Sequence, residues 1–157
     1  MEAKVKIAKA SISFDFLAVG DWSPGKFRVT SDYSVGHLLL NLEGPVLSGS
    51  HEILQRISKV GPHLSSKALP KFAKFIVASL ANNHIMDFGV NGGIQTEEAI
   101  ARENGISGGF GKSLNQSREP KIFKYKQKSV GLLSVAEDQF GRATLREGGY
   151  ATVGPWL

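Results

Sequence analysis

Three short apolar runs organise the first half of the chain, and each of them ends at polar residues. The runs cover residues 12–19, 37–42 and 75–81. Short apolar runs bounded by turn-forming residues are typical of strands buried in a sheet. In open α/β sheets ligands bind beyond the carboxyl ends of the strands, so we expect a functional site at these ends. The polar residues found there are Asp21 after the first run, Glu43 after the second, and Asn82, Asn83 and His84 after the third.

Two other segments predict helices. Ser65 and Ser66 are suited to cap a short helix that extends to Ala73. Residues 90–104 carry apolar residues at helical spacing, and Gly105 stands where a helix commonly ends.

The last third of the chain predicts a pair of strands. Residues 121–125 and 130–136 look like partners joined around Gln127 and Lys128. The succession of strand, helix, strand, helix and strand pair indicates an α/β fold, in which a layered mixed β-sheet has flanking helices. The periodicity does not give the order of the strands within the sheet.

Composition narrows the chemistry. The chain has 157 residues, the length of a single domain, and 41% of them are hydrophobic, as in ordinary globular proteins. It contains no cysteine, which excludes a disulfide scaffold, thiolate metal sites and a cysteine nucleophile. A metal would therefore be held by His, Asp, Glu or Asn side chains. The net charge of +5 permits an anionic partner without identifying it.

The sequence predicts neither a targeting signal nor a membrane span. Its first residues are charged or alternate polar with apolar, instead of forming the continuous apolar stretch of a signal peptide. No window approaches the ~18 apolar residues of a transmembrane helix. We therefore expect a protein without a membrane span that is cytoplasmic by default.

Two segments have compositions that also occur in nucleotide-binding or nucleic-acid-binding proteins. Residues 108–113 are rich in glycine but lack the spacing of a phosphate-binding loop or a dinucleotide fingerprint, so we interpret them as a turn. Residues 121–128 alternate lysines with Phe123 and Tyr125, a pattern that a single-strand nucleic-acid binder can use. The alternative is an edge strand with its aromatic residues inward and its lysines outward. We favour the edge strand and expect no specific nucleic-acid partner, because no recognition module accompanies the pattern.

The residues at the strand ends indicate a more specific chemistry. Asp21, Glu43, Asn83 and His84 offer the oxygen and nitrogen donors that Mg²⁺, Mn²⁺, Fe or Zn²⁺ accept. A metal held there would polarise a phosphoryl or acyl oxygen and activate a water molecule. The same residues also suit structural roles, as a turn cap, a solvated strand end, a turn amide and a hydrogen-bonded histidine. Spacing alone leaves both interpretations open.

Three motifs resemble those of a known family. They are Gly20-Asp21, Asn41-Leu42-Glu43-Gly44-Pro45 and Ser79-Leu80-Ala81-Asn82-Asn83-His84-Ile85-Met86-Asp87-Phe88-Gly89. In this order they resemble the motifs of the CapA family, whose members are associated with bacterial capsule and poly-γ-glutamate synthesis and often work at the cell envelope. The resemblance runs from residue 12 to residue 137. It implies a calcineurin-like metallophosphatase fold, and this chain would form the N-terminal part of that sandwich.

The resemblance also implies a role for each residue of the site. Asp21, Glu43 and Asn83 would bind a divalent metal. His84 would act over the substrate as proton donor or charge stabiliser, and Asp87 would orient His84 or support its loop. The activity would be that of a metal-dependent phosphoesterase or hydrolase, acting on a phosphoester or an anionic envelope polymer.

The chain departs from the family in its histidines. Of His37, His51, His63 and His84, none lies after His84, whereas family members continue into further histidine motifs. We therefore expect residues 1–157 to form a single CapA-like domain that is incomplete at its C-terminus and has an incomplete metal site. An oligomer or a complementing chain would then supply the missing ligands. The alternative function is that of a truncated, catalytically inactive remnant or a polymer-binding module.

Overall fold

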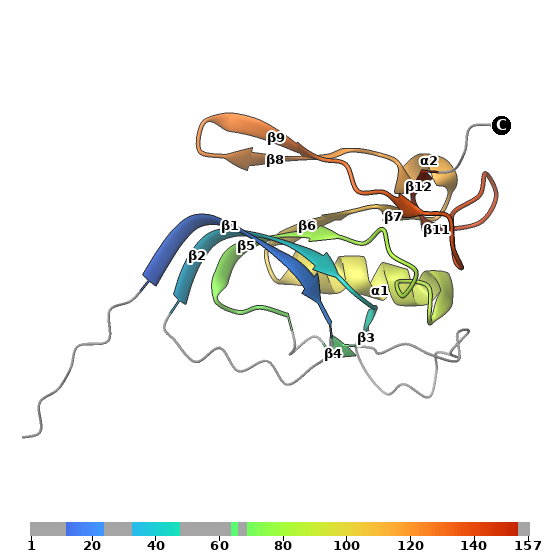
Figure 1. The fold of residues 1–157 in the computed structure, drawn as a ribbon, viewed down its shortest axis with the longest axis horizontal. Coiled ribbons are helices and arrows are strands. Elements are labelled where there is room, and N and C mark those ends of the chain that lie inside the picture. The colour runs from blue at the N-terminus through green and yellow to red at the C-terminus, as the bar shows by residue number, and fades with distance from the viewer. Residues whose placement is uncertain (1–11, 24–32, 48–63, 66–68, 154–157) are drawn as a thin grey trace, which may run out of the picture.

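A four-stranded parallel sheet forms the centre of the molecule (Figure 1). The structure is a computed structural model that describes residues 12–23, 33–47, 64–65 and 69–153. Every pair of neighbouring strands in the sheet is parallel, so the expected α/β class is confirmed, although the central sheet is parallel rather than mixed. The strands lie in the order β1 (Ile12–Trp22), β2 (Tyr33–Leu42), β5 (Ala73–Ser79) and β6 (Gly105–Gly108).

The second and third apolar runs of the sequence correspond to β2 and β5, the inner strands of the sheet, which are covered on both faces. Leu38 and Leu40 of β2, together with Ile76 and Val77 of β5, are at most 1% exposed. Parallel strands buried on both faces read as continuous apolar runs, because neither face can carry polar side chains. β1 lies at the edge of the described sheet, and the expectation of a buried strand is wrong there: Phe14, Phe16 and Val19 are 39%, 36% and 40% exposed, because an edge strand has a neighbour on one side only.

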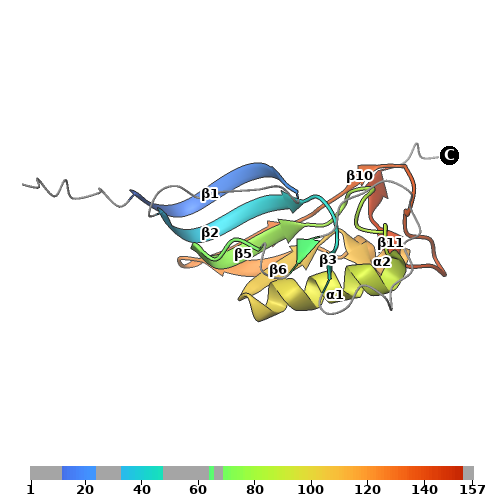
Figure 2. The same cartoon turned by 90° about the horizontal axis from the view of Figure 1, so that it is seen from below.

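The helix α1 (Gly89–Arg102) packs along the sheet beside β6 (Figure 2). The buried Thr96 hydroxyl accepts a hydrogen bond from the backbone N–H of Val46 at 2.9 Å and donates to the carbonyl oxygen of Gly92 at 2.7 Å. These bonds tie α1 to the short strand β3 (Val46–Leu47), which pairs in parallel with β4 (Leu64–Ser65). The helix predicted over residues 90–104 is confirmed to within two residues at each end.

The end of α1 differs from the prediction in the residue that turns the chain. The left-handed conformation belongs to Asn104, with φ 56°, and not to Gly105. Asparagine tolerates this conformation better than other side chains do. Gly105 instead begins β6, where an added Cβ atom would lie 2.8 Å from the carbonyl oxygen of Ile76. The glycine is therefore required for the close approach of α1 to the sheet.

The helix predicted from Ser65 to Ala73 is wrong for the described residues of that range. Ser65 belongs to β4, and a turn at residues 71–72 leads directly into β5. Pro70 disfavours the helical conformation at Leu69, since the proline ring clashes with the residue before it. Leu69 is 2% exposed and belongs to the core, so this segment is held by packing instead of by helical hydrogen bonds.

A hairpin of β8 (Lys121–Tyr125) and β9 (Lys128–Leu132) covers the face of the sheet opposite α1 (Figure 1). Phe123 is 6% exposed, and its ring centroid lies 6.0 Å from those of His37 and Phe75. The aromatic residues of β8 therefore point inward, as the edge-strand interpretation expects, and Lys124 is exposed. The second strand is shorter and earlier than the predicted residues 130–136, because the turn lies at Lys126 and the residue after it.

Short elements complete the C-terminal side of the described chain. The turn predicted over residues 108–113 is only partly correct: Gly108 ends β6, Phe110 and Gly111 form β7, and bends lie at Gly109 and at residues 112–113, before a four-residue helix that was not predicted. No helix in the described part of the chain is long and apolar enough to cross a membrane. The elements are β7 (Phe110–Gly111), α2 (Leu114–Ser117), β10 (Ala136–Glu137), β11 (Gly149–Tyr150) and β12 (Thr152–Val153).

Tyr150 anchors this C-terminal part. Its side chain is fully buried, its hydroxyl donates to the carbonyl oxygen of Glu137 at 3.0 Å, and it accepts a hydrogen bond from the backbone N–H of Gln139 at 2.8 Å. Burial raises the pKa of the Tyr150 hydroxyl, so the neutral hydroxyl keeps both bonds over the whole physiological pH range.

We expect Gly93→Ala to destabilise the protein, although alanine is ordinarily the better helix former by up to ~1 kcal/mol. An added Cβ atom at Gly93 would overlap the ring of Phe110, which is buried and cannot retreat. Overpacking of this kind costs about 1–3 kcal/mol. Gly20→Ala is the matched control, since nothing lies within 4 Å of its added Cβ atom. Urea denaturation would measure both variants, and a Gly93→Ala protein as stable as wild type would contradict the packing described here.

Candidate functional site

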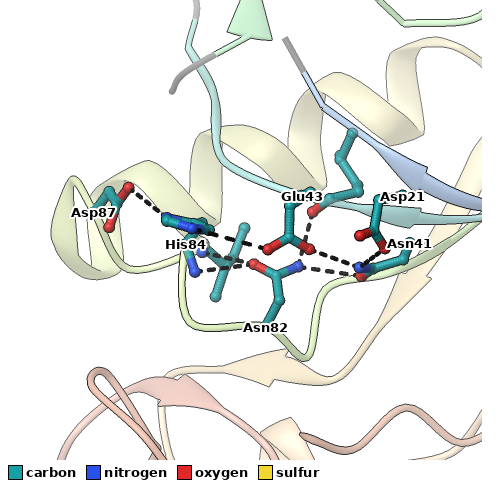
Figure 3. A network of polar contacts seen from close by, with 8 residues as sticks. Asp21, Asn41, Glu43, Asn82, His84 and Asp87 are labelled. Atoms are coloured by element: carbon teal, nitrogen blue, oxygen red, sulfur yellow. Dashed lines mark hydrogen bonds and ion pairs between the residues drawn. The ribbon is translucent and has the colours of Figure 1, made fainter. Parts of the chain in front are cut away.

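The carboxyl ends of β1, β2 and β5 lie side by side. Asp21 of β1 is the register partner of Asn41 of β2, and Asn41 is in turn the partner of Ser79 of β5. Parallel pairing brings strand ends to the same edge of a sheet, so the polar residues that follow each strand also converge there. The network that results includes Glu43 after β2 and His84 after β5 (Figure 3).

Asn41 joins the two carboxylates of this edge. Its Nδ2 donates to Asp21 Oδ1 at 2.8 Å and to Glu43 Oε2 at 2.7 Å. Its Oδ1 accepts a hydrogen bond from Asn82 Nδ2 at 3.3 Å. Two carboxylates that share one donor are held close together despite their like charges. Asn41 therefore sets the spacing of the acidic pair.

Asn82 holds the loop that follows β5. Its side chain is 6% exposed, and its Oδ1 accepts hydrogen bonds from the backbone N–H groups of His84 at 3.1 Å and Ile85 at 3.0 Å. This arrangement is the side-chain turn that asparagine forms with the backbone ahead of it. Its Nδ2 also donates to the carbonyl oxygen of Leu42 at 2.9 Å. The loop carrying His84 is thus fastened to the end of β2.

His84 lies between two carboxylates. Its Nδ1 is 3.0 Å from Asp87 Oδ2, and its Nε2 is 4.0 Å from Glu43 Oε1. The Asp87 side chain is only 1% exposed, and an ionised carboxylate can only accept hydrogen bonds. With an ionised Asp87, the imidazole donates from Nδ1 to Asp87, and Nε2 is then turned toward Glu43. A histidine held in this way can take up or release a proton at Nε2.

The structure brings four of the five predicted residues into one network, namely Asp21, Glu43, His84 and Asp87 (Figure 3). Asn83 lies next to them and is partly buried, but it takes no part in the network that the described residues form.

Two residues of the network, Asn41 and Asn82, received no individual role in the sequence analysis. Asn41 is polar at the end of an otherwise apolar run, and this break in the pattern was the available signal. For Asn82 the signal was ambiguous, because two asparagines stand side by side and the loop conformation decides which one is buried.

The donor atoms at this edge suit a hard cation. Within the described residues no three His, Asp or Glu side chains lie close enough to enclose a metal ion, while His51 and His63 lie outside them. The amide NH₂ of Asn41 carries a partial positive charge and occupies the position between Asp21 Oδ1 and Glu43 Oε2. A cation would be attracted to the same pair of oxygens. Two carboxylates with neighbouring amide oxygens are the donor chemistry that Mg²⁺ and Mn²⁺ prefer.

Comparison with known families agrees with the motifs of the sequence. The model of the bacterial capsule synthesis protein family PGA_cap matches residues 30–152, well over half of the chain. The matched range includes Glu43, Asn83, His84 and Asp87, and Asp21 lies before it. No curated protein gives a significant match. The family match confirms the resemblance to capsule synthesis proteins.

Proposed function

This chain belongs to the bacterial capsule synthesis protein family PGA_cap, and from that premise we propose that its site binds a divalent metal and acts on a phosphoester or an anionic polymer during capsule synthesis. Asp21, Glu43 and Asn83 hold the metal in this proposal, and His84 exchanges a proton with the substrate. In the same proposal the parallel sheet, with its site at the strand ends, is part of a metallophosphatase-like sandwich.

The observation that carries the proposal is the position of His84. Its Nδ1 is held by the buried carboxylate of Asp87 at 3.0 Å, and its Nε2 faces Glu43 at 4.0 Å. Asp87 fixes the orientation of the ring and stabilises the imidazolium that forms when Nε2 takes up a proton. A group of this kind can deliver a proton to a leaving oxygen or accept one from an attacking water molecule.

The acidic pair supplies the second support. Asp21 and Glu43 lie at the ends of strands, where the sheet limits their movement, and they share the Asn41 amide. When bound, the metal would polarise a phosphoryl oxygen as a Lewis acid. Asp21 and Glu43 would bind it, Asn83 would add an amide oxygen after a change of side-chain conformation, and Asn41 would keep the carboxylates in place.

Charge favours an anionic substrate. The whole chain carries a net charge of +5, which attracts polyanions at a distance. The site itself is acidic, with Asp21, Glu43 and Asp87 against one imidazole, so an anion would approach it only after a cation has neutralised the carboxylates. We therefore expect substrate binding to require the metal.

Calorimetric titration of the full chain with Mn²⁺ tests the metal site. We expect Asp21→Asn and Glu43→Gln each to weaken Mn²⁺ binding about tenfold or more, because each removes a charged oxygen ligand. Asp15→Asn is the matched control: Asp15 is an exposed aspartate of the same strand that pairs with Lys126 at 3.0 Å. Absence of Mn²⁺ binding at millimolar concentration, or equal losses at Asp15 and Asp21, would contradict the proposal.

Turnover of p-nitrophenyl phosphate with and without Mn²⁺ tests the catalytic part separately. We expect hydrolysis that depends on the metal. A chain that binds Mn²⁺ but hydrolyses no phosphoester would support the polymer-binding alternative instead.

A further inference from the structure

A second polar pocket lies where α1, β7, α2 and β8 meet, and none of the strand-end residues lines it. Its volume is about 270 Å³, and we call it the α1–α2 pocket. Four elements contribute to its wall, so its shape depends on the tertiary fold. Its wall includes the side chains of Glu97, Phe110, Lys112, Gln116, Glu119 and Lys121.

Glu97 and Glu119 both line the α1–α2 pocket, and Glu97 is the carboxylate that has no ion pair, since Glu119 pairs with Lys121. Glu97 is half-buried, and it makes no hydrogen bond or ion pair with any described residue. Burial raises the pKa of its carboxyl group above the ordinary value, although the positive charges of Lys121 and Lys112 act in the opposite direction. The Glu97 carboxylate thus has less stabilisation in the protein than in water, and a positively charged partner would restore it.

Lys112 is the positive group. Lys121 already has a partner, since its ammonium lies 2.8 Å from Glu119 Oε2. Among the described residues the Lys112 ammonium has no ion pair, and its backbone N–H donates to Gln116 Oε1 at 2.9 Å. That bond occupies the Gln116 oxygen and leaves the Gln116 NH₂ group as a further donor beside Lys112. The pocket therefore presents a carboxylate on α1 and hydrogen-bond donors on the β7–α2 side.

These charges line one pocket without pairing with each other, because Glu97 and Lys112 are not within ion-pair distance. A ligand that fits must carry the reverse pattern, with a cationic group toward Glu97 and an anionic group toward Lys112. A single anion would face the Glu97 carboxylate, and a single cation would face the two lysines. A small zwitterion satisfies both ends.

We propose that the α1–α2 pocket binds a small zwitterion of the α-amino acid class. The ammonium group of the ligand pairs with Glu97, and its carboxylate pairs with Lys112 and the Gln116 amide. The pocket is polar and open to water, so each pair is partly screened and binding is weak, about millimolar. This binding is independent of the strand-end site and of any metal.

A titration of the ¹⁵N-labelled full chain with L-alanine, followed by NMR, tests the proposal. We expect saturable shifts of the backbone amide signals of Glu97, Lys112 and Gln116. N-acetyl-L-alanine lacks the ammonium group and L-alaninamide lacks the carboxylate, so each should bind about tenfold more weakly or worse. Equal binding of N-acetyl-L-alanine would indicate a plain anion site and would overturn the zwitterion proposal.

The same NMR titration of substituted proteins is the second test of the proposal. Glu97→Gln keeps the side-chain length, Lys112→Gln replaces the ammonium with a shorter neutral side chain, and each should weaken L-alanine binding about tenfold. Glu98→Gln is the matched control, because Glu98 is an exposed neighbour on α1 that faces Arg102. Unchanged binding in Glu97→Gln, no saturable shift at all, or shifts confined to the strand-end residues would each reject the proposal.

Discussion

Asn82→Ala is expected to lower the free energy of unfolding by about 2–4 kcal/mol, whereas Asn83→Ala should lower it by less than ~1 kcal/mol. The two asparagines are adjacent, yet only the first is 6% exposed and bonded on every side. Removing the Asn82 amide leaves the N–H groups of His84 and Ile85 and the carbonyl oxygen of Leu42 without their partner. A buried polar group left unpaired costs about 1–3 kcal/mol.

Urea denaturation of the three proteins measures this difference directly. Asn82→Asp is the informative third variant, because it retains the acceptor oxygen for the loop but loses the Nδ2 donor to Leu42 and Asn41. We expect its stability to lie between those of wild type and Asn82→Ala. Equal losses for Asn82→Ala and Asn83→Ala would show that the loop is not held as described.

The same pair of variants separates structural from functional roles. In the proposed function Asn83 is a metal ligand, so Asn83→Ala should weaken Mn²⁺ binding while the protein remains as stable as wild type. Asn82→Ala, in contrast, should lower the free energy of unfolding. A result in which Asn83→Ala unfolds the chain would assign it a structural role and remove it from the proposed metal site.

The second large effect is expected at His84. Replacing His84 with glutamine should lower metal-dependent phosphoester turnover by about 10²–10⁴-fold, the usual contribution of a general acid or base. Glutamine retains a hydrogen-bonding side chain but cannot exchange a proton near neutral pH. Asp87→Asn should lower turnover less, by about 10–100-fold, because Asp87 acts through the orientation and charge of His84.

A pH profile of turnover distinguishes proton transfer from a structural role. Loss of proton transfer should change the shape of the profile in His84→Gln, whereas a purely structural loss should lower turnover by the same factor at every pH. The matched control is His37→Gln, since the His37 ring packs among aromatic residues between the sheet and the hairpin and is remote from the strand ends. If His84→Gln retained wild-type turnover and the same pH profile, His84 would not be the proton-transfer group.

Much of the fold could be predicted because its central elements have strong local patterns. β2 and β5 are continuous apolar runs, and α1 has helical spacing over three to four turns. All three elements can therefore be identified without knowledge of distant residues. The segment from Ser65 to Ala73 could not be predicted in this way. Its capping serines suggested a helix, but the burial of Leu69 and the conformational restriction by Pro70 favour a turn.

The candidate site, too, could be predicted from the sequence only in part. Asp21, Glu43 and His84 could be proposed from their places after apolar runs, because parallel strands bring their carboxyl ends together. Asn41 could not, since its role is to bridge two residues that are 20 and 2 positions away in the chain. The α1–α2 pocket was also beyond sequence reasoning: Glu97 lies on α1 and belongs to no motif, and Lys112 lies in the glycine-rich segment that was interpreted as a turn.

The sequence by itself thus determined which segments become the main strands, which polar residues stand at their ends, and the family to which the motifs belong. These features depend on the local alternation of apolar and polar residues. Only the tertiary structure decided that Asn82, and not Asn83, is buried in the network. The reason is that hydrogen bonds form between groups brought together by the register of the strands. That register results from the packing of the whole sheet against α1 and the hairpin.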